Sequence, residues 1–399
     1  MEKTLTDFSG FWQRKETQVH LSSWIQSALE EDAATRDLTA ALLKNGNESS
    51  RARAVIIAKA PGVLCGVEAV VQTLKALDPH LVIRHCAEDG SHVSVGEKVF
   101  EADSQAHLLL AGERTALNIC GHLSGISTAT AEMVSQAGSV SILDTRKTMP
   151  GIRRFQKHAV LVGGGVNHRF DLADFPMFKE NHRALIQQER PELKQKPDAE
   201  MSWIRQRLLE EGYTGTIAIE VEDEASMRAC LNEGIEIILV DNIPPAQLSE
   251  WLGRAKKDGL PVDASRLEAS GGIDQGSLEE HASSGVGRIS VGAITHSSPI
   301  LDLSMSVEAI SGNDLRSRRE SGSPAAEAAA GKKAVAAAGG SAEKAAQRIE
   351  AHTRGIAGRK RARVIKVAVE PDTDPEVAGA LLRLKQEVAA ALQKILTIF

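Results

Sequence analysis

Short apolar runs alternate with helical stretches over the second half of the first 300 residues. The runs end at Leu143, Val162, Phe178, Ile219, Val240, Leu267 and Val291, and helical stretches lie between several of them, for example at 224–232, 246–256 and 275–282. Strand, loop and helix in repetition are typical of a parallel sheet covered by helices. The pattern predicts an α/β fold with a parallel, TIM-like open barrel over residues 129–296.

The residues before this region show a different pattern. Apolar positions at helical spacing occur between residues 20 and 31, and strand-like runs follow at 54–58, 81–86 and 99–102, with turn signals between them. We expect a sandwich-like α/β domain over 20–128, completed by about 297–310.

A long helix is predicted over 113–137, beginning after Gly112 and ending at Gly138. Gly121 and Gly125 lie four apart on one side of it, a spacing that suits close packing against another element. Arg114 stands at the expected start of the helix, where the positive end of the helix dipole disfavours a cation. From the residues alone, a surface role and a ligand-binding role for Arg114 are equally open.

The last part of the chain changes in composition. Residues 311–345 are rich in Ala, Gly and Ser and are interpreted as a linker, and residues 346–399 carry a basic run at 359–363 followed by a predicted helix. The net charge of −6 argues against a wholly nucleic-acid-binding protein. Binding of nucleic acid through the tail stays an open alternative, although short basic runs are commonly just solvated.

The four cysteines, Cys65, Cys86, Cys120 and Cys230, show neither a CxxC pair nor a metal-ligand spacing. We expect reduced thiols in a cytoplasmic protein and no zinc site. The amino terminus lacks the apolar stretch of a signal peptide, and no apolar run approaches the about 20 residues that span a bilayer. A soluble protein without a membrane partner is predicted.

Positive charge is concentrated between residues 144 and 182. Arg146 and Lys147 follow the run that ends at Leu143, His168 and Arg169 follow a triple glycine, and Lys179 follows a further short run. Each group stands where a predicted strand ends, which is where α/β folds bind ligands. Several fixed cations in one place repel one another unless a multiply anionic ligand binds them. The ligand is predicted to be small and polyanionic.

The later strand ends add carboxylates and glycines. Glu220 and Asp241 end two predicted strands and are candidates to hold Mg²⁺ and sugar hydroxyls, the alternative being a salt bridge to Lys147 or Lys179. Small residues that let backbone N–H groups approach a phosphate follow at two more strand ends, with a histidine close behind: Ser270, Gly271, Gly272, Gly292 and His296.

The motifs in this order resemble the quinolinate phosphoribosyltransferase family, also called nicotinate-nucleotide pyrophosphorylase (carboxylating). They are Glu-Arg-Thr-Ala-Leu-Asn at 113–118, Asp-Thr-Arg-Lys-Thr at 144–148, Gly-Gly-Gly-Val-Asn-His-Arg at 163–169, Lys-Glu-Asn-His at 179–182, Glu-Ala-Ser-Gly-Gly-Ile at 268–273 and Ser-Val-Gly-Ala-Ile-Thr-His at 290–296. The resemblance covers roughly residues 20 to 308. Arg36 departs from the glycine of the family's Gly-Asp-Leu-Thr turn.

The resemblance implies transfer of phosphoribosyl from phosphoribosyl pyrophosphate to quinolinate with loss of CO₂, in a homodimer or larger homo-oligomer. Quinolinate would be bound by Arg146, His168, Arg169 and Lys179, with Arg114 donated by the neighbouring subunit. Lys147, Glu220 and Asp241 would act in catalysis and bind phosphoribosyl pyrophosphate together with Ser270, Gly271, Gly272, Gly292 and His296. Mg²⁺ would be held, in part indirectly, by Glu220 and Asp241. The competing enzyme hypothesis is a phosphate-handling aldolase that uses Lys147 or Lys179 as a nucleophile.

Overall fold

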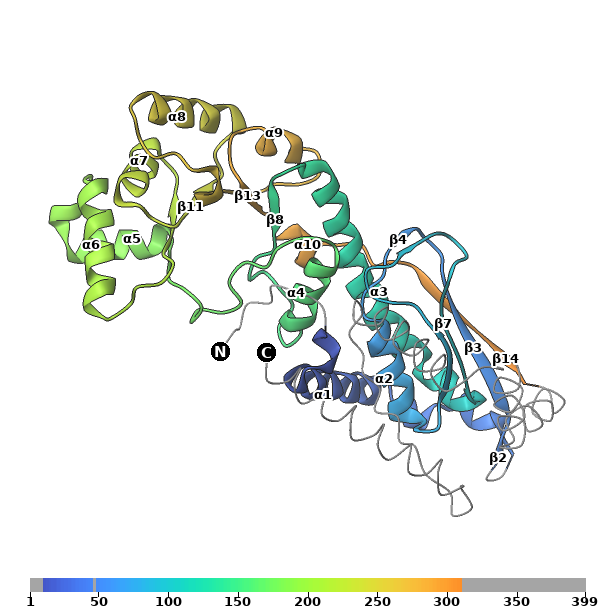
Figure 1. Cartoon of the computed structure of the whole chain (residues 1–399). Helices are drawn as coiled ribbons and strands as arrows, with labels where there is room; N and C mark the ends of the chain where they lie inside the picture. Colours follow the sequence, from blue (N-terminus) through green and yellow to red (C-terminus); the bar gives the residue numbers. More distant parts are fainter. Residues whose placement is uncertain (1–9, 46–47, 311–399) are drawn as a thin grey trace, which may run out of the picture. The chain divides into compact units, whose positions relative to one another are not determined.

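The computed structural model describes residues 10–45 and 48–310 (Figure 1). The predicted linker at 311–345 and tail at 346–399 lie outside the described residues. Within the described part of the chain, every helix is too short or too polar to traverse a lipid bilayer.

An antiparallel sheet with the strand order β14-β3-β7-β5 forms the first layer of the fold. Its strands are β3 (Arg51–Ala58), β5 (Val82–Cys86), β7 (Lys98–Gln105) and β14 (Leu303–Ala309). Every second residue of β3 is buried, because successive side chains of a strand point to opposite faces. The buried face packs in one apolar cluster with α2 (Val67–Leu77) and the first half of α3 (Ala106–Ala137). β14 pairs with β3 from Leu303 opposite Ala58 to Ala309 opposite Ala52.

Smaller elements surround this sheet. α1 covers Lys15–Glu31. β4 (Gly62–Val63) pairs with β6 (His92–Val93), and β1 (Lys44–Asn45) pairs with β2 (Glu48–Ser49). Short 3₁₀ turns lie at Phe11–Gln13, Ala34–Arg36, Ala40–Leu43, Pro191–Leu193 and Ala264–Arg266.

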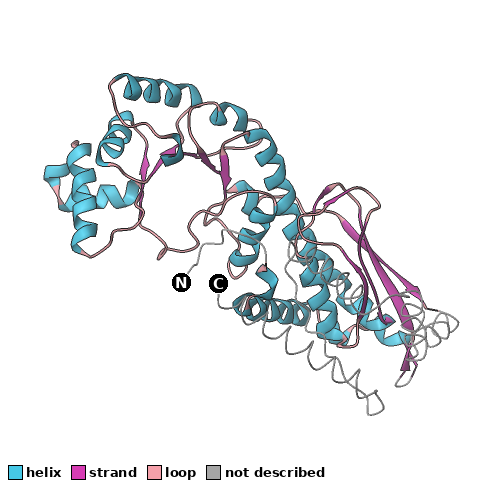
Figure 2. Cartoon of the chain, in the orientation of Figure 1, coloured by secondary structure: helices cyan, strands magenta, loops and turns pink. Residues whose placement is uncertain are grey.

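α3 contacts elements of both sheets, and its course can be followed in Figure 2. Its predicted start was wrong: the helix begins at Ala106, and Gly112 lies inside it, where the missing side chain makes room for Leu74 and Leu77. Arg114 is therefore an exposed residue well within the helix, and the helix-dipole argument does not apply to it.

The expected close approach at Gly121 and Gly125 is confirmed. A Cβ atom at Gly125 would lie 2.0 Å from the carbonyl oxygen of Pro299, and the N–H of Leu301 donates to the carbonyl of Gly121 at 3.0 Å. Only glycine permits such contact between a helix and a neighbouring backbone. The two glycines thereby fix the segment that leads into β14.

The second sheet has six strands in the order β8-β13-β12-β11-β10-β9, all parallel. β8 and β9 are its edges, so the sheet is open, as predicted for this part of the chain. The strands are β8 (Ser141–Leu143), β9 (Met177–Phe178), β10 (Ala218–Val221), β11 (Ile237–Asp241), β12 (Leu267–Ser270) and β13 (Arg288–Ser290). The helices are α4 (Arg153–Val162), α5 (Glu180–Glu189), α6 (Pro197–Glu210), α7 (Glu224–Glu233), α8 (Pro245–Lys257), α9 (Leu278–Ala282) and α10 (Ala293–His296).

The strand predicted to end at Val162 is wrong, because residues 159–162 are the last turn of α4. Both faces of this turn are buried, so its four apolar residues in a row carry no periodicity that separates a helix from a strand. His168 and Arg169 consequently follow a loop, and this loop is tied to the sheet where Val166 forms an isolated parallel bridge with Leu143. The extended connection between His182 and Thr216 contains most of α5 and all of α6.

Candidate active site

A hollow of about 500 Å³ opens at the carboxyl ends of the parallel strands. Parallel strands all end at one edge, so side chains that follow different strands meet there. The hollow is lined by Thr145, Arg146, Lys147, His168, Arg169, Met177, Lys179, Leu239, Asp241, Asn242, Glu268, Ser270, Gly271, Gly272 and Ser290. The cations predicted from three separate sequence motifs therefore share one cavity.

Arg146 and Arg169 give this cavity an excess of positive charge. Arg169 is buried and donates from Nη1 to the carbonyl of Phe175 at 3.0 Å, and its pKa is lowered by burial first and then by the like charge of Arg146. The Nε atom of Arg146 is also buried and has no hydrogen-bond partner among the described residues. Two guanidinium groups that repel each other, one with an unused buried donor, favour an anionic ligand between them.

A buried ion pair beneath the cavity holds the backbone that carries these residues. Lys157, on α4, and Asp144, directly after β8, are both fully buried and paired with each other. The Asp144 carboxylate accepts the backbone N–H of His168 at 2.8 Å, and the Lys157 ammonium donates to the carbonyl of His168 at 2.9 Å. Burial raises the pKa of Asp144 to about 6, against the opposing charge of Lys157. Both members of the ion pair therefore form hydrogen bonds with the backbone of His168, in the loop that lines the cavity.

Replacing Lys157 by Met is expected to destabilise the protein by about 3–5 kcal/mol, because it leaves the Asp144 carboxylate buried without its cation. The double variant Asp144→Asn/Lys157→Met should recover most of this loss, since Asn keeps an acceptor for the N–H of His168 and removes the charge. Urea unfolding of the three proteins measures the difference. Equal stability of the single and the double variant would show that the pair does not act as a unit.

The His168 ring is oriented by a backbone N–H and faces a buried carboxylate. Its Nδ1 accepts the backbone N–H of Arg169 at 2.7 Å, which assigns the ring proton to Nε2. That nitrogen lies 3.4 Å from Oε1 of Glu268, which is fully buried and also paired with Arg288 at 3.0 Å. Glu268 thus lies at the base of the cavity, facing His168.

Lys179 and Glu220 form an ion pair. This is the salt bridge that the sequence left open as the alternative role of Glu220. Glu220 and Asp241 come from the neighbouring strands β10 and β11, as predicted. Negative charge gathers around them: the pKa of Glu222 is raised by desolvation first, then by Glu180, Asp241 and Glu220. Among the described residues, Lys179 is the one cation lining the cavity that forms an ion pair with one of these carboxylates.

Gly271 and Gly272 are favoured by their backbone conformation, and Gly292 by the side chains around it. Gly271 has φ +97° and Gly272 has φ +61°, conformations that other residues rarely adopt, and a Cβ atom at Gly271 would overlap Asn242. At Gly292 a Cβ atom would crowd Lys147 and His296, at 3.0 Å and 3.2 Å. Gly292 and His296 do not line the cavity but border Lys147, which does.

Four predicted site residues do not line the cavity: Arg114, Glu220, Gly292 and His296. Glu220 adjoins it through its ion pair with Lys179, whereas Arg114 is exposed on α3. Several lining residues were in turn missed by the sequence reasoning: Thr145, Met177, Leu239, Asn242, Glu268 and Ser290. Glu268 had a detectable signal, because it is a carboxylate within a predicted buried strand. The others have side chains too common at strand ends to stand out.

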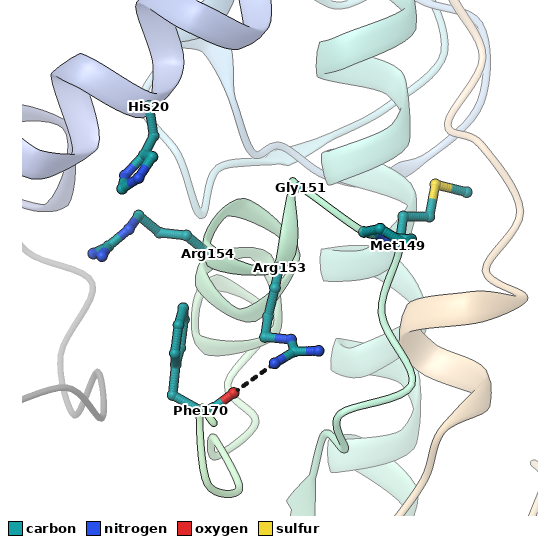
Figure 3. A pocket seen from close by; sticks show the side chains of 7 residues that line it. His20, Met149, Gly151, Arg153, Arg154 and Phe170 are labelled. Atoms are coloured by element: carbon teal, nitrogen blue, oxygen red, sulfur yellow. Dashed lines mark hydrogen bonds between the residues drawn. The ribbon is translucent and has the colours of Figure 1, made fainter. Parts of the chain in front are cut away.

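Arg153 and Arg154, which belong to the same cationic stretch, face a second hollow of about 370 Å³ beside His20 (Figure 3). Arg153 donates to the carbonyl of Phe170 at 3.0 Å and to Thr148 at 2.9 Å. Arg154 pairs with Glu16 at 3.2 Å and lies over the Phe170 ring. Arg153 is held by the Phe170 carbonyl and Thr148 and Arg154 by Glu16, so we assign the ligand-binding charge to the larger cavity.

An open parallel α/β sheet with a cationic cavity at its strand ends defines the class of α/β enzymes that act on small polyanions. Residues 37–124 match the N-terminal domain and residues 126–306 the C-terminal domain of quinolinate phosphoribosyl transferase. The chain therefore belongs to the quinolinate phosphoribosyl transferase family.

Individual relatives agree with this assignment. The chain is 36% identical over 279 residues to a probable nicotinate-nucleotide pyrophosphorylase (carboxylating) of Bacillus subtilis, covering 69% of this chain and 90% of that protein. It is 34% identical to the Mycobacterium leprae nicotinate-nucleotide pyrophosphorylase (carboxylating), covering 63% and 84%. The crystal structure of NadC from Streptococcus pyogenes superimposes with a TM-score of 0.64 at 30% identity, covering 73% of this chain and 98% of that one.

Proposed function

We propose that this protein transfers the phosphoribosyl group of phosphoribosyl pyrophosphate to quinolinate and releases pyrophosphate and CO₂, giving nicotinate mononucleotide for NAD biosynthesis. The observation that carries the proposal is the pair of mutually repelling guanidinium groups of Arg146 and Arg169 in one cavity, with a buried donor of Arg146 unused. Membership of the family favours this pentosyl transfer over the imine-forming aldolase.

Quinolinate carries two adjacent carboxylates, so it matches a site with more than one cation. In the proposed complex Arg146 and Arg169 each bind a carboxylate, and charge-assisted hydrogen bonds of this kind contribute about 1.5–3 kcal/mol each. Lys179 adds a third cation, and His168 lines the same cavity. Nicotinate, with one carboxylate, leaves a guanidinium unpaired and should bind poorly.

Phosphoribosyl pyrophosphate is proposed to bind on the Lys147 side of the cavity. The backbone around Gly271 and Gly272 lets N–H groups approach a phosphate, and Ser270, Gly292 and His296 complete this side. Glu220 and Asp241 are proposed to bind the ribose hydroxyls. Their negative charge stabilises the positive charge that develops on the sugar as the pyrophosphate departs.

The carboxylates also fit a hard divalent cation such as Mg²⁺, because Glu220, Glu222 and Asp241 crowd negative charge at neighbouring strand ends. Glu220 and Asp241 would hold it, in part through water or the substrate's phosphates. Mg²⁺ would neutralise charge on the pyrophosphate leaving group.

In the proposed reaction the ring nitrogen of quinolinate forms a bond to the anomeric carbon while the bond to pyrophosphate breaks. Lys147 stabilises the negative charge on the departing pyrophosphate. The ribosylated nitrogen is cationic, so the ring can accept the electron pair released when the adjacent carboxylate leaves as CO₂, and a proton then replaces it. The residues of the cavity supply binding and electrostatic stabilisation, and no covalent intermediate with the protein is required.

The proposal is tested by incubating the purified chain with quinolinate and phosphoribosyl pyrophosphate and measuring pyrophosphate and CO₂. We expect both products in equal amounts, dependence on Mg²⁺, and little product with nicotinate in place of quinolinate. Turnover of nicotinate at a comparable rate, or pyrophosphate release without CO₂, would contradict the assignment of the dicarboxylate.

We further propose that the working unit is a homodimer or a larger oligomer in which Arg114 reaches the cavity of a neighbouring subunit. Arg114 is exposed and lies outside its own cavity, which is what a residue donated across an interface requires.

A further inference from the structure

Three side chains that could ligate a metal ion meet away from the proposed active site. Cys65 directly precedes the N-cap residue of α2, Asp89 lies in the turn before β6, and His158 lies on α4. The Cys65 sulfur lies 3.7 Å from Oδ2 of Asp89, and Nε2 of His158 lies 3.3 Å from the same oxygen. All three ligand atoms lie within 4.8 Å of one another, and this is the one such group found among the described residues.

We propose that Cys65, Asp89 and His158 supply three ligands for one divalent cation of the zinc class. Zn²⁺ binds sulfur at about 2.3 Å and nitrogen or oxygen at about 2.0–2.2 Å in a tetrahedron, which sets the ligand atoms roughly 3.3–3.7 Å apart. The two distances to Asp89 have these values already. A thiolate, an imidazole and a carboxylate together suit zinc and not Mg²⁺ or Ca²⁺, which prefer oxygen ligands alone.

Charge balance supports a dication at this place. Cys65 and His158 are almost completely buried, and a buried site is stable when its charges cancel. A thiolate and a carboxylate carry two negative charges, which one divalent cation neutralises. Binding displaces the thiol proton to solvent, and the His158 ring contributes a lone pair as its proton moves to Nδ1.

The surroundings hold Asp89 in place as a ligand. Its Oδ1 accepts the backbone N–H groups of Gly66 and Val67 at 2.9 Å and 3.2 Å, and its Oδ2 accepts Nε1–H of Trp12 at 2.8 Å. The Phe11 ring stacks on His158 with the centroids 3.8 Å apart and covers the group. Groups that orient the ligands in this manner raise metal affinity by about 10- to 100-fold.

A cation here would connect the N-terminal domain to α4. Cys65 and Asp89 belong to the segments around α2, while His158 follows Lys157, whose ammonium group holds the loop of His168. The site would therefore stabilise the helix that supports the proposed active site without contacting the substrates. Its existence is independent of the reaction that the protein catalyses.

The test is cobalt substitution in the full-length chain, purified without a histidine tag. We expect one Co²⁺ per chain, with thiolate-to-cobalt charge-transfer absorption and the intense visible bands of tetrahedral coordination, both abolished by Zn²⁺. Cys65→Ser and, independently, Cys65→Ala should remove the charge-transfer band, and His158→Gln should weaken binding by about 100-fold or more. A second measurement is the zinc content of protein that was expressed with added zinc. It does not require a metal ion to enter the chain after folding.

Matched controls come from the exposed residues Cys86 and His85. Cys86→Ser and His85→Gln should leave the spectrum and the stoichiometry unchanged, and added Zn²⁺ should raise the thermal midpoint of wild type but not of Cys65→Ser. The proposal is overturned if wild type shows no thiolate-to-cobalt absorption, or if the absorption survives in Cys65→Ser and disappears in Cys86→Ser.

Discussion

Replacing Arg169 by Ala is expected to raise the dissociation constant for quinolinate by roughly 30-fold to several thousand-fold. Arg169 is buried beside Arg146, so its loss leaves one carboxylate of the ligand desolvated without a cation, at a cost of about 2–5 kcal/mol. The Michaelis constant for phosphoribosyl pyrophosphate should change little, because that substrate is proposed to bind on the side of Lys147. Isothermal titration with quinolinate and steady-state kinetics measure the two effects separately.

Arg154→Ala is the matched control for this experiment. Arg154 belongs to the same cationic stretch, but it pairs with Glu16 outside the cavity, so its removal should leave quinolinate binding close to wild type. Arg169→Lys should lie between the two, since it keeps the charge and loses the planar, two-pronged donor. Near-normal turnover of Arg169→Ala would remove this residue from the site, and an equal loss in Arg154→Ala would point to a general effect of charge.

Much of the cavity could be predicted because parallel strands bring their carboxyl ends to one edge. Arg146, Asp241 and Ser270 are far apart in the sequence, yet each stands at or just beyond the end of a strand, and the topology alone places them together. Residues 159–162 were wrongly predicted as a strand, because burial on both faces removes the periodicity that distinguishes a helix from a strand. His168 reaches the cavity from a loop, held by Asp144 and Lys157.

Other features depend on contacts that no local pattern encodes. The long helix was predicted to begin after Gly112, but Gly112 lies inside α3, where Leu74 and Leu77 occupy the space that a side chain would need. The folded chain brings Cys65 to Asp89 and His158 from three separate segments, a proximity that the spacing of the cysteines does not encode. The orientation of the His168 ring likewise depends on a backbone N–H, which the sequence does not locate.

The proposed exchange of Arg114 between subunits predicts that two inactive variants restore each other. In a mixed dimer of Arg114→Ala and Lys147→Ala, one cavity combines an intact Lys147 with the intact Arg114 of the other chain, and the second cavity lacks both. Random mixing places half of the chains in mixed dimers, so about a quarter of the wild-type sites, and about a quarter of its activity, should return. The measurement is turnover after the two variants are denatured together and refolded, or co-expressed with different tags.

The control is a mixture of Lys147→Ala with Arg169→Ala. Lys147 and Arg169 line the same cavity of one chain, so a mixed dimer of these variants contains two defective cavities and should stay inactive. Recovery of activity in the first mixture and not in the second would show that Arg114 acts in the cavity of a neighbouring subunit. If neither mixture recovers although mixed dimers form, each chain builds its site alone, and the exposed position of Arg114 on α3 requires a different explanation.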